Sequence, residues 1–201
     1  MFMNSIEEIF NLNQKQPLPS KGNLLIAEPF LTENYFRRSA ICLIDNSSLY
    51  PTMGIVLNNR MNLYLSDVLE DMDTLQKIPL YCGGPVGNDR LYFMHTLGSI
   101  IPDSIEIVPG LYINGDFEIA KSFLLSGMET EGNIRFFIGY SGWDKGQLEE
   151  ELKKHVWAVT DIKDTRELLH GGGNEYWRKL VNEMGPQYKR WLSCPQQPSM
   201  N

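Results

Sequence analysis

The chain has 201 residues, of which 42% are hydrophobic, 11% aromatic and 21% charged. This composition is typical of a globular protein and excludes a wholly disordered, collagenous or coiled-coil chain. The 18 basic and 25 acidic residues give a formal net charge of −7. That charge disfavours broad nucleic-acid binding, because such binding depends on neutralising phosphates. The length predicts one domain, with at most a short appendage.

The cysteines and the first residues predict where the protein resides. Cys42, Cys82 and Cys194 are few, odd in number and far apart, which is not the pattern of a secreted disulfide framework. Glu7 and Glu8 stand where a signal peptide would carry Lys or Arg. No apolar stretch approaches the roughly 20 residues of a membrane span. We therefore expect a cytoplasmic protein without a membrane partner.

Short apolar runs predict the strands. Before them, residues 1–21 form an appendage with a capping box, Ser5 and Glu8, for one short helix. From residue 22 onward, runs rich in β-branched and aromatic residues are typical of buried strands. These runs lie at 23–27, 39–44, 53–57, 78–82, 90–95, 105–108, 111–113, 134–140 and 156–160. The runs 105–108 and 111–113 flank Pro109 and Gly110, a two-residue turn that predicts a hairpin.

Amphipathic spacing predicts the helices between these strands. Leu65, Val68, Leu69 and Met72 recur at i, i+3, i+4 and i+7, which predicts a helix over 63–75. Further helices are expected from the cap Asp116 to Gly127, over 147–154, and around Leu168, Trp177, Leu180 and Trp191. Helices and hairpin-like strands are mixed without a strict βαβ alternation, so the pattern favours an α+β fold.

Two glycine-rich segments are candidates for a site. Gly83–Gly87 could let a ligand or another segment approach the backbone closely, because glycine has no Cβ. Gly139–Trp143 is similar to the nucleophile elbow G-x-S-x-G, but its last position is Trp143. A tight strand-to-helix turn would explain both of its glycines without a nucleophile.

Few side chains are candidates for chemistry. Among the histidines, His95 is the favoured acid/base group because it ends a strand near the glycine loop. Arg37, Arg38 and Arg60 are further guanidinium candidates for a carboxylate or phosphate, although single arginines at strand and helix ends are usually solvated. Standard nucleotide, zinc and calcium motifs are absent from the sequence, so we expect no metal site and no cofactor.

Cys42 and Cys82 leave a redox role open. Both lie in apolar strands, where a thiol is usually a small hydrophobic side chain. If the two strands were neighbours and a thiol pKa were lowered, the pair could act in redox chemistry.

Several short segments together point to a family. They are Gly22–Pro29, Met53–Asn58, Gly83–Val86 with Asp89, Arg90 and His95, Gly139–Trp143, and Gly146–Glu149. In this order they resemble the AlgH/YqgE family of bacterial proteins. The resemblance implies an α+β fold with a bent, mixed, partly barrel-like β-sheet surrounded by helices. It places the domain at 22–185, between the appendage 1–21 and a C-terminal extension, 186–201, and it implies no particular activity.

Three functions are weighed. The leading hypothesis is a non-catalytic regulatory or small-ligand-binding protein, whose partner is an unknown small molecule or protein. Its pocket would lie where loop 83–90 meets turn 139–143, since glycines, an aromatic ring and a few polar groups would converge there. The expected ligand-binding residues are Gly83, Gly84, Pro85, Asp89, Arg90, His95, Tyr140, Ser141, Gly142 and Trp143.

The alternatives are an enzyme and a DNA-binding transcriptional regulator. The enzyme would act on a small anionic or acyl substrate, with His95 as acid/base, Ser141 as nucleophile or hydrogen-bond donor, and Arg90 holding the anion. DNA binding is disfavoured because the chain is acidic and its sequence shows no recognisable helix-turn-helix pattern.

Overall fold

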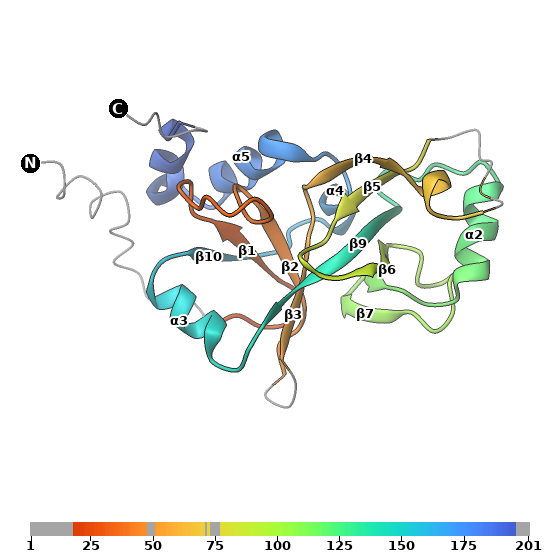
Figure 1. Ribbon diagram of the computed structural model, residues 1–201, viewed down its shortest axis with the longest axis horizontal. Coiled ribbons are helices and arrows are strands. Elements are labelled where there is room, and N and C mark those ends of the chain that lie inside the picture. The colour runs from red at the N-terminus through yellow and green to blue at the C-terminus, as the bar shows by residue number, and fades with distance from the viewer. Residues whose placement is uncertain (1–17, 48–50, 71, 73–76, 196–201) are drawn as a thin grey trace, which may run out of the picture.

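The computed structural model describes residues 18–47, 51–70, 72 and 77–195, which are organised by one curled β-sheet (Figure 1). Its strands are β1 (Asn23–Ala27), β2 (Ala40–Asp45), β3 (Thr52–Val56), β4 (Arg60–Tyr64), β5 (Pro79–Cys82), β6 (Val86–His95), β7 (Ile105–Val108), β8 (Leu111–Ile113), β9 (Ile134–Trp143) and β10 (Trp157–Asp161). The helical elements are η1 (Leu65–Asp67), α2 (Phe117–Leu125), α3 (Gln147–Lys153), α4 (Thr165–Leu168), α5 (Gly173–Glu183) and η2 (Pro186–Ser193), of which η1 and η2 are 3₁₀ helices.

The strand order is β10-β1-β2-β3-β9-β6-β8-β7, and neighbours along this path are antiparallel. Strand β9 is shared between the two halves of the sheet, because it pairs with β3 near its end and with β6 along most of its length. It also pairs in parallel with β5, which carries β4. The expected α+β fold with a bent, mixed sheet is confirmed.

Both faces are buried along β1, β2 and most of β9, which explains why these strands read as unbroken apolar runs, whereas β4 and the first half of β6 are largely exposed. In β1, Leu24 and Ile26 pack into a core with Trp177 of α5, while Leu25 packs on the opposite face with Leu148 of α3. A third core lies under α2. Figure 1 shows α5 and α3 beside the half of the sheet that holds β1, and α2 beside the other half.

The prediction of a helix over 63–75 is wrong. Residues up to Tyr64 belong to β4, and only Leu65–Asp67 follow as a 3₁₀ turn. Tyr64 pairs with Pro79 of β5, and the N–H of Leu65 donates to the carbonyl of Ile78. Pairing with a strand later in the chain therefore overrides the helical spacing. Residues 71 and 73–76 lie outside the described part of the chain.

Other local predictions are confirmed. Strands β7 and β8 form the expected antiparallel hairpin. Asp116 caps α2, because its carboxylate accepts the N–H of Ile119 at 3.1 Å. The capping box at Ser5 and Glu8 lies outside the described residues.

A buried arginine of β9 fixes the chain that leads into α5. The guanidinium of Arg135 donates to the carbonyls of Leu57 at 2.9 Å, Leu169 at 2.6 Å and Gly171 at 2.8 Å. It also lies 4.2 Å from the ring centroid of Tyr81. Burial lowers the pKa of Arg135. Its hydrogen bonds to carbonyls offset that cost and hold the segment after α4 against the end of β3.

Substituting Arg135→Lys should lower the free energy of unfolding by roughly 3 kcal/mol, because a lysine ammonium cannot reach three carbonyls arranged for a planar fork. Urea unfolding measures this change. The exposed Arg90→Lys is the matched control, for which a change within about 0.5 kcal/mol is expected. Equal effects of the two substitutions would contradict the role of Arg135.

Candidate functional site

The structure brings the loop Gly83–Gly87 against strand β9. Val86 pairs with Tyr140, and a Cβ built on Gly84 would stand 2.2 Å from the carbonyl carbon of Tyr140. Glycine is required at this position because the two backbones touch. Main chain therefore fills the space between loop and strand. Four of the predicted ligand residues lie on the exposed surface of these segments. They are Pro85, Asp89, Arg90 and Gly142.

Ser141 and Trp143 lie inside β9 and not in a strand-to-helix turn, so that prediction is wrong. The strand continues to Trp143 because its last residues pair with β3, and α3 begins only at Gln147. Ser141 is 1% exposed, and its hydroxyl donates to the carbonyl of Gly83 at 3.2 Å. The indole N–H of the buried Trp143 donates to Glu151 at 2.8 Å. Both side chains therefore hold the strand to its neighbours.

His95 lies far from Ser141. It pairs with Ile134 at the opposite end of β9, and seven residues of strand at about 3.3 Å each separate Ile134 from Ser141, roughly 20 Å. Proton transfer needs contact or one bridging water. The arrangement in which His95 serves Ser141 as acid/base is therefore absent from this structure.

The contacts of His95 describe a structural side chain. It is fully buried and lies between the rings of Phe93 and Tyr112, with centroids at 5.6 and 5.7 Å. Its Nδ1 accepts the N–H of Leu97 at 3.1 Å, so Nε2 carries the proton that is donated to the carbonyl of Asn114 at 2.9 Å. Burial lowers the pKa of His95. The neutral ring is the form that satisfies both neighbours.

The conditions for a redox role of Cys42 and Cys82 are not met. Cys42 lies in β2 and Cys82 in β5, which are not neighbours in the sheet. Both thiols are free. Burial raises the pKa of Cys42 to about 12 and also raises the pKa of Cys82. A reactive thiol needs the opposite shift.

A hollow of about 440 Å³ opens at another place, between the β1–β2 connection, the β3–β4 turn and the start of α5. We call it the Arg38 hollow. Its lining residues are Asn34, Tyr35, Arg37, Arg38, Ser39, Asn58, Asn59, Gly173 and Asn174. Pockets of about 300–1,000 Å³ commonly hold small-molecule ligands.

Asn58 joins the three walls of this hollow. Its side-chain oxygen accepts the N–H of Ala40 at 2.9 Å, and its side-chain nitrogen donates to the carbonyls of Arg38 and Gly173, both at 2.9 Å. Its own carbonyl accepts the N–H of Gly173 at 2.7 Å. The walls are therefore fixed before any ligand arrives.

Arg38 is held in an unusual conformation on one wall. Its φ of 50° lies in the left-handed region, which costs a non-glycine residue roughly 1 kcal/mol or more. The guanidinium donates to the side-chain oxygen of Asn174 at 2.9 Å and to the carbonyl of Cys194 at 2.7 Å. It also lies 4.8 Å from the ring centroid of Trp177. Several contacts therefore impose a conformation that the backbone alone would avoid.

Two buried polar atoms on this wall have no hydrogen-bond partner within the described residues. They are Nε of Arg38, which is 5% exposed, and Oγ of Ser39, which is 2% exposed. An unpaired buried donor or acceptor costs about 1–3 kcal/mol. Such groups are rare in native proteins; among the described residues, Nδ1 of His155 and Nε1 of Trp191 are the other two.

The hollow is also electropositive. Arg37 and Arg38 line it, and its described lining contains no carboxylate. Burial lowers the pKa of Arg38, and repulsion from Arg178 and Arg37 lowers it further. Arg178 itself donates to the carbonyl of Leu192 at 2.9 Å. The charges of Arg178 and Arg37 therefore both act on Arg38, and no carboxylate forms an ion pair with any of the three in the described part of the chain.

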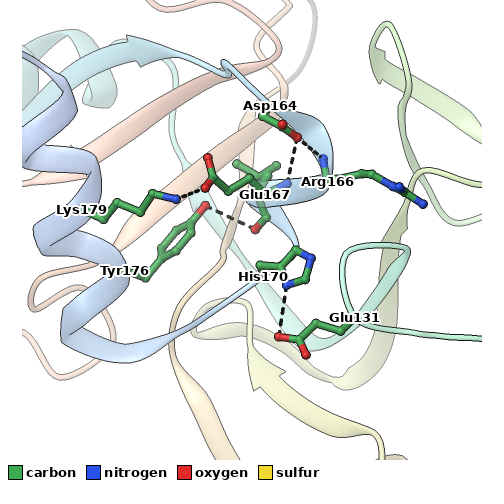
Figure 2. Close-up of polar contacts among 8 residues, drawn as sticks. Glu131, Asp164, Arg166, Glu167, His170, Tyr176 and Lys179 are labelled. Carbon is green, nitrogen blue, oxygen red and sulfur yellow. Dashed lines mark hydrogen bonds and ion pairs between the residues drawn. The ribbon is translucent and has the colours of Figure 1, made fainter.

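A second hollow, of about 650 Å³, lies beside α4 and the exposed side of α5 and differs in its charges. Figure 2 shows that several polar groups of this surface have partners within the chain. Lys179 contacts Glu167, His170 lies 3.2 Å from Glu131, and Asp164 accepts backbone N–H groups at the start of α4. Several of the polar groups of this surface therefore already have partners within the protein.

Two further properties were tested on the described residues. No three His, Cys, Asp or Glu side chains among them gather as metal ligands would. None of the helices in this part of the chain has the length and hydropathy needed to cross a bilayer.

Comparison with known proteins places the chain in a family. Residues 24–189 match the family model described as AlgH-like. A UPF0301 protein of Parabacteroides distasonis is 41% identical over 99% of this chain and 100% of its own length. A UPF0301 protein of Bacteroides thetaiotaomicron is 38% identical with the same coverage. The chain belongs to the AlgH-like family.

Solved structures agree with this AlgH-like fold. Protein DIP2367 of Corynebacterium diphtheriae superposes with a TM-score of 0.73 at 20% identity, covering 89% of this chain and 94% of that one. The AlgH protein of Pseudomonas aeruginosa superposes with a TM-score of 0.67 at 26% identity, covering 92% and 99%. The AlgH-like match at 24–189 includes every residue that lines the Arg38 hollow.

The arginines of the Arg38 hollow could be recognised as candidates in the sequence, but the hollow itself could not. Arg37 and Arg38 were visible as guanidinium candidates at the start of a strand. Asn58, Ser39 and Asn174 carried no signal of their own, because only the fold brings these distant positions together.

The neutral state of His95 can be measured directly. Nitrogen chemical shifts of its ring should report an Nε2–H tautomer that stays neutral to a lower pH than the same ring in the urea-unfolded chain, which should titrate near its ordinary pKa of about 6.5. The protein should therefore be fully stabilised by this group above pH 6.5 and lose that stability as the pH falls below it, since only the unfolded chain binds the proton there. A native midpoint at or above 6.5 would contradict the assignment.

Two buried serines provide a matched test of the unpaired hydroxyl. Ser141→Ala removes a hydrogen-bonded hydroxyl and should lower the free energy of unfolding by about 1 kcal/mol. Ser39→Ala removes an unpaired one and should leave the free energy of unfolding unchanged or raise it by up to about 1 kcal/mol. Chemical unfolding of both variants decides the matter. A larger loss for Ser39→Ala than for Ser141→Ala would show that Ser39 is paired within the protein.

Proposed function

We propose that this protein is a non-catalytic, cytoplasmic regulatory or ligand-binding protein, and that its small ligand occupies the Arg38 hollow. The observation that carries this proposal is the pair of unpaired buried atoms, Arg38 Nε and Ser39 Oγ, on the wall of a hollow of about 440 Å³. A ligand with polar atoms would supply the partners that the chain withholds.

The hollow suits binding because its walls are preformed. Asn58 fixes the two loops and the helix start relative to each other, and Arg135 fixes the segment that precedes α5. Less ordering is then needed when a ligand enters, so more of the contact energy is retained as affinity.

Neither alternative function has comparable support. An enzyme acting through His95 and Ser141 would need the two side chains in contact, but His95 lies beside one end of β9 and Ser141 near the other. A DNA-binding regulator would need a surface able to neutralise many phosphates, while the chain carries a net charge of −7.

A thermal-shift screen of small metabolites on the wild type and on Asn34→Trp tests the proposal. Asn34 is exposed at the mouth of the hollow, so tryptophan there should obstruct entry without disturbing the core. Any ligand of the hollow should raise the midpoint of the wild type, because it binds only the folded state, and should fail to raise that of Asn34→Trp.

Asn88→Trp is the matched control, since Asn88 is exposed beside the glycine loop. Its response to ligands should equal that of the wild type. A ligand whose effect is lost in Asn88→Trp but kept in Asn34→Trp would move the site to the glycine loop and overturn the proposal.

A further inference from the structure

We propose that the ligand of the Arg38 hollow is a small organic phosphate, whose phosphate group lies against Arg38, Arg37 and the first turn of α5. This inference rests on the proposed function, because it names the chemical class of the ligand for the same hollow. Four observations carry it: uncompensated charge, free donors, the helix terminus and the size of the hollow.

Three arginines carry positive charge at or near the hollow. Arg37 and Arg38 line the hollow, and Arg178 is close enough for its charge to act on Arg38. Like charges in a partly buried place repel each other, and the part of the lining that the structure describes holds no carboxylate to compensate them. A dianionic phosphate would neutralise two of these charges, which a neutral ligand cannot do.

Arg38 and Ser39 have hydrogen-bond donors without a partner among the described residues. The guanidinium of Arg38 has five N–H groups, and its described hydrogen bonds go to Asn174 and to Cys194. Among the described residues its Nε has no hydrogen-bond partner, and neither has the hydroxyl of Ser39. A guanidinium fork binds phosphate oxygens in pairs, and a serine hydroxyl can donate to a third oxygen after rotation about its side-chain bond.

The N-terminus of α5, a helix of 11 residues, borders the hollow. Its N-cap is Gly172, which has no side chain to bind the first N–H groups, and among the described residues a hydrogen bond at this end runs from the N–H of Gly173 to the carbonyl of Asn58. Asn174 of the first turn lines the hollow, whereas the acidic Glu175 lines the second hollow. Free N–H groups and the helix dipole favour an anion at this end.

The size observation indicates an ester rather than a bare ion. A hollow of about 440 Å³ lies in the range that holds whole small molecules. Beyond the arginines, its lining offers the ring of Tyr35, which is 41% exposed, and the amides of Asn34 and Asn59. A ring and amides suit a planar or hydroxylated body attached to the phosphate.

Titration of the full chain with inorganic phosphate, followed by NMR at an ionic strength held constant with sodium chloride, tests the anion site without requiring the ester. The Arg38 Nε–H signal and the backbone amide signals of Gly173 and Asn174 should shift and saturate with a Kd on the order of 1 mM. Arg37→Gln should weaken this binding about tenfold, and because Arg37 is exposed the fold should be unaffected. Arg38→Gln should abolish the shifts.

Arg90→Gln is the control, because Arg90 is an exposed arginine of β6 near the glycine loop, and its substitution should leave the Kd unchanged. Shifts that do not saturate up to about 50 mM phosphate would overturn the inference, since even weak specific binding saturates in that range. Binding that is lost in Arg90→Gln and kept in Arg37→Gln would overturn it as well.

A parallel screen with uncharged fragments separates the two proposals. If uncharged fragments stabilise the wild type but not Asn34→Trp while phosphate does not bind, the proposed function stands and the phosphate class is wrong. If neither fragments nor phosphate bind, both are wrong. If succinate saturates the same signals and phosphate does not, the ligand is a carboxylate and the phosphate class is wrong.

Discussion

The side-chain amide of Asn58 is the contact on which the arrangement of the site depends. It joins the end of the β1–β2 connection, the β3–β4 turn and the start of α5 through three hydrogen bonds of 2.9 Å. A buried amide whose donor and acceptor are both satisfied specifies a single geometry, because any displacement leaves a polar group unpaired. The left-handed backbone of Arg38 is kept in place in this way, since its carbonyl is one of the three partners.

Features encoded locally could be read from the sequence. Strands such as β1 and β2 were recognisable because both of their faces are covered, so their residues are apolar without interruption, whereas the largely exposed β4 was missed. The cap at Asp116 and the hairpin at β7 and β8 depend on neighbouring residues only. The segment around Leu65 failed for the opposite reason. Its spacing suits a helix, but a strand partner at Pro79 determines its structure.

The candidate site could be read only in part. Glycines 83, 84 and 139 signal a close approach to the backbone, and the structure shows that what approaches is the chain itself. For Arg38, the residue type was informative, but its burial on Trp177 and its unpaired Nε depend on segments more than a hundred residues away. No spacing rule connects positions 38, 58 and 174, because their proximity is a property of the sheet and the helix laid across it.

The central place of β9 has a consequence for how the chain folds during synthesis. Strands β3, β5 and β6 all leave the ribosome before β9, which is the neighbour that joins them, and β1 waits for β10 on its outer edge. Contacts of such large sequence separation form late and slow folding. The nascent N-terminal half therefore exposes unpaired strand edges until most of the protein has been translated, and this is the period in which chaperones would protect it from aggregation.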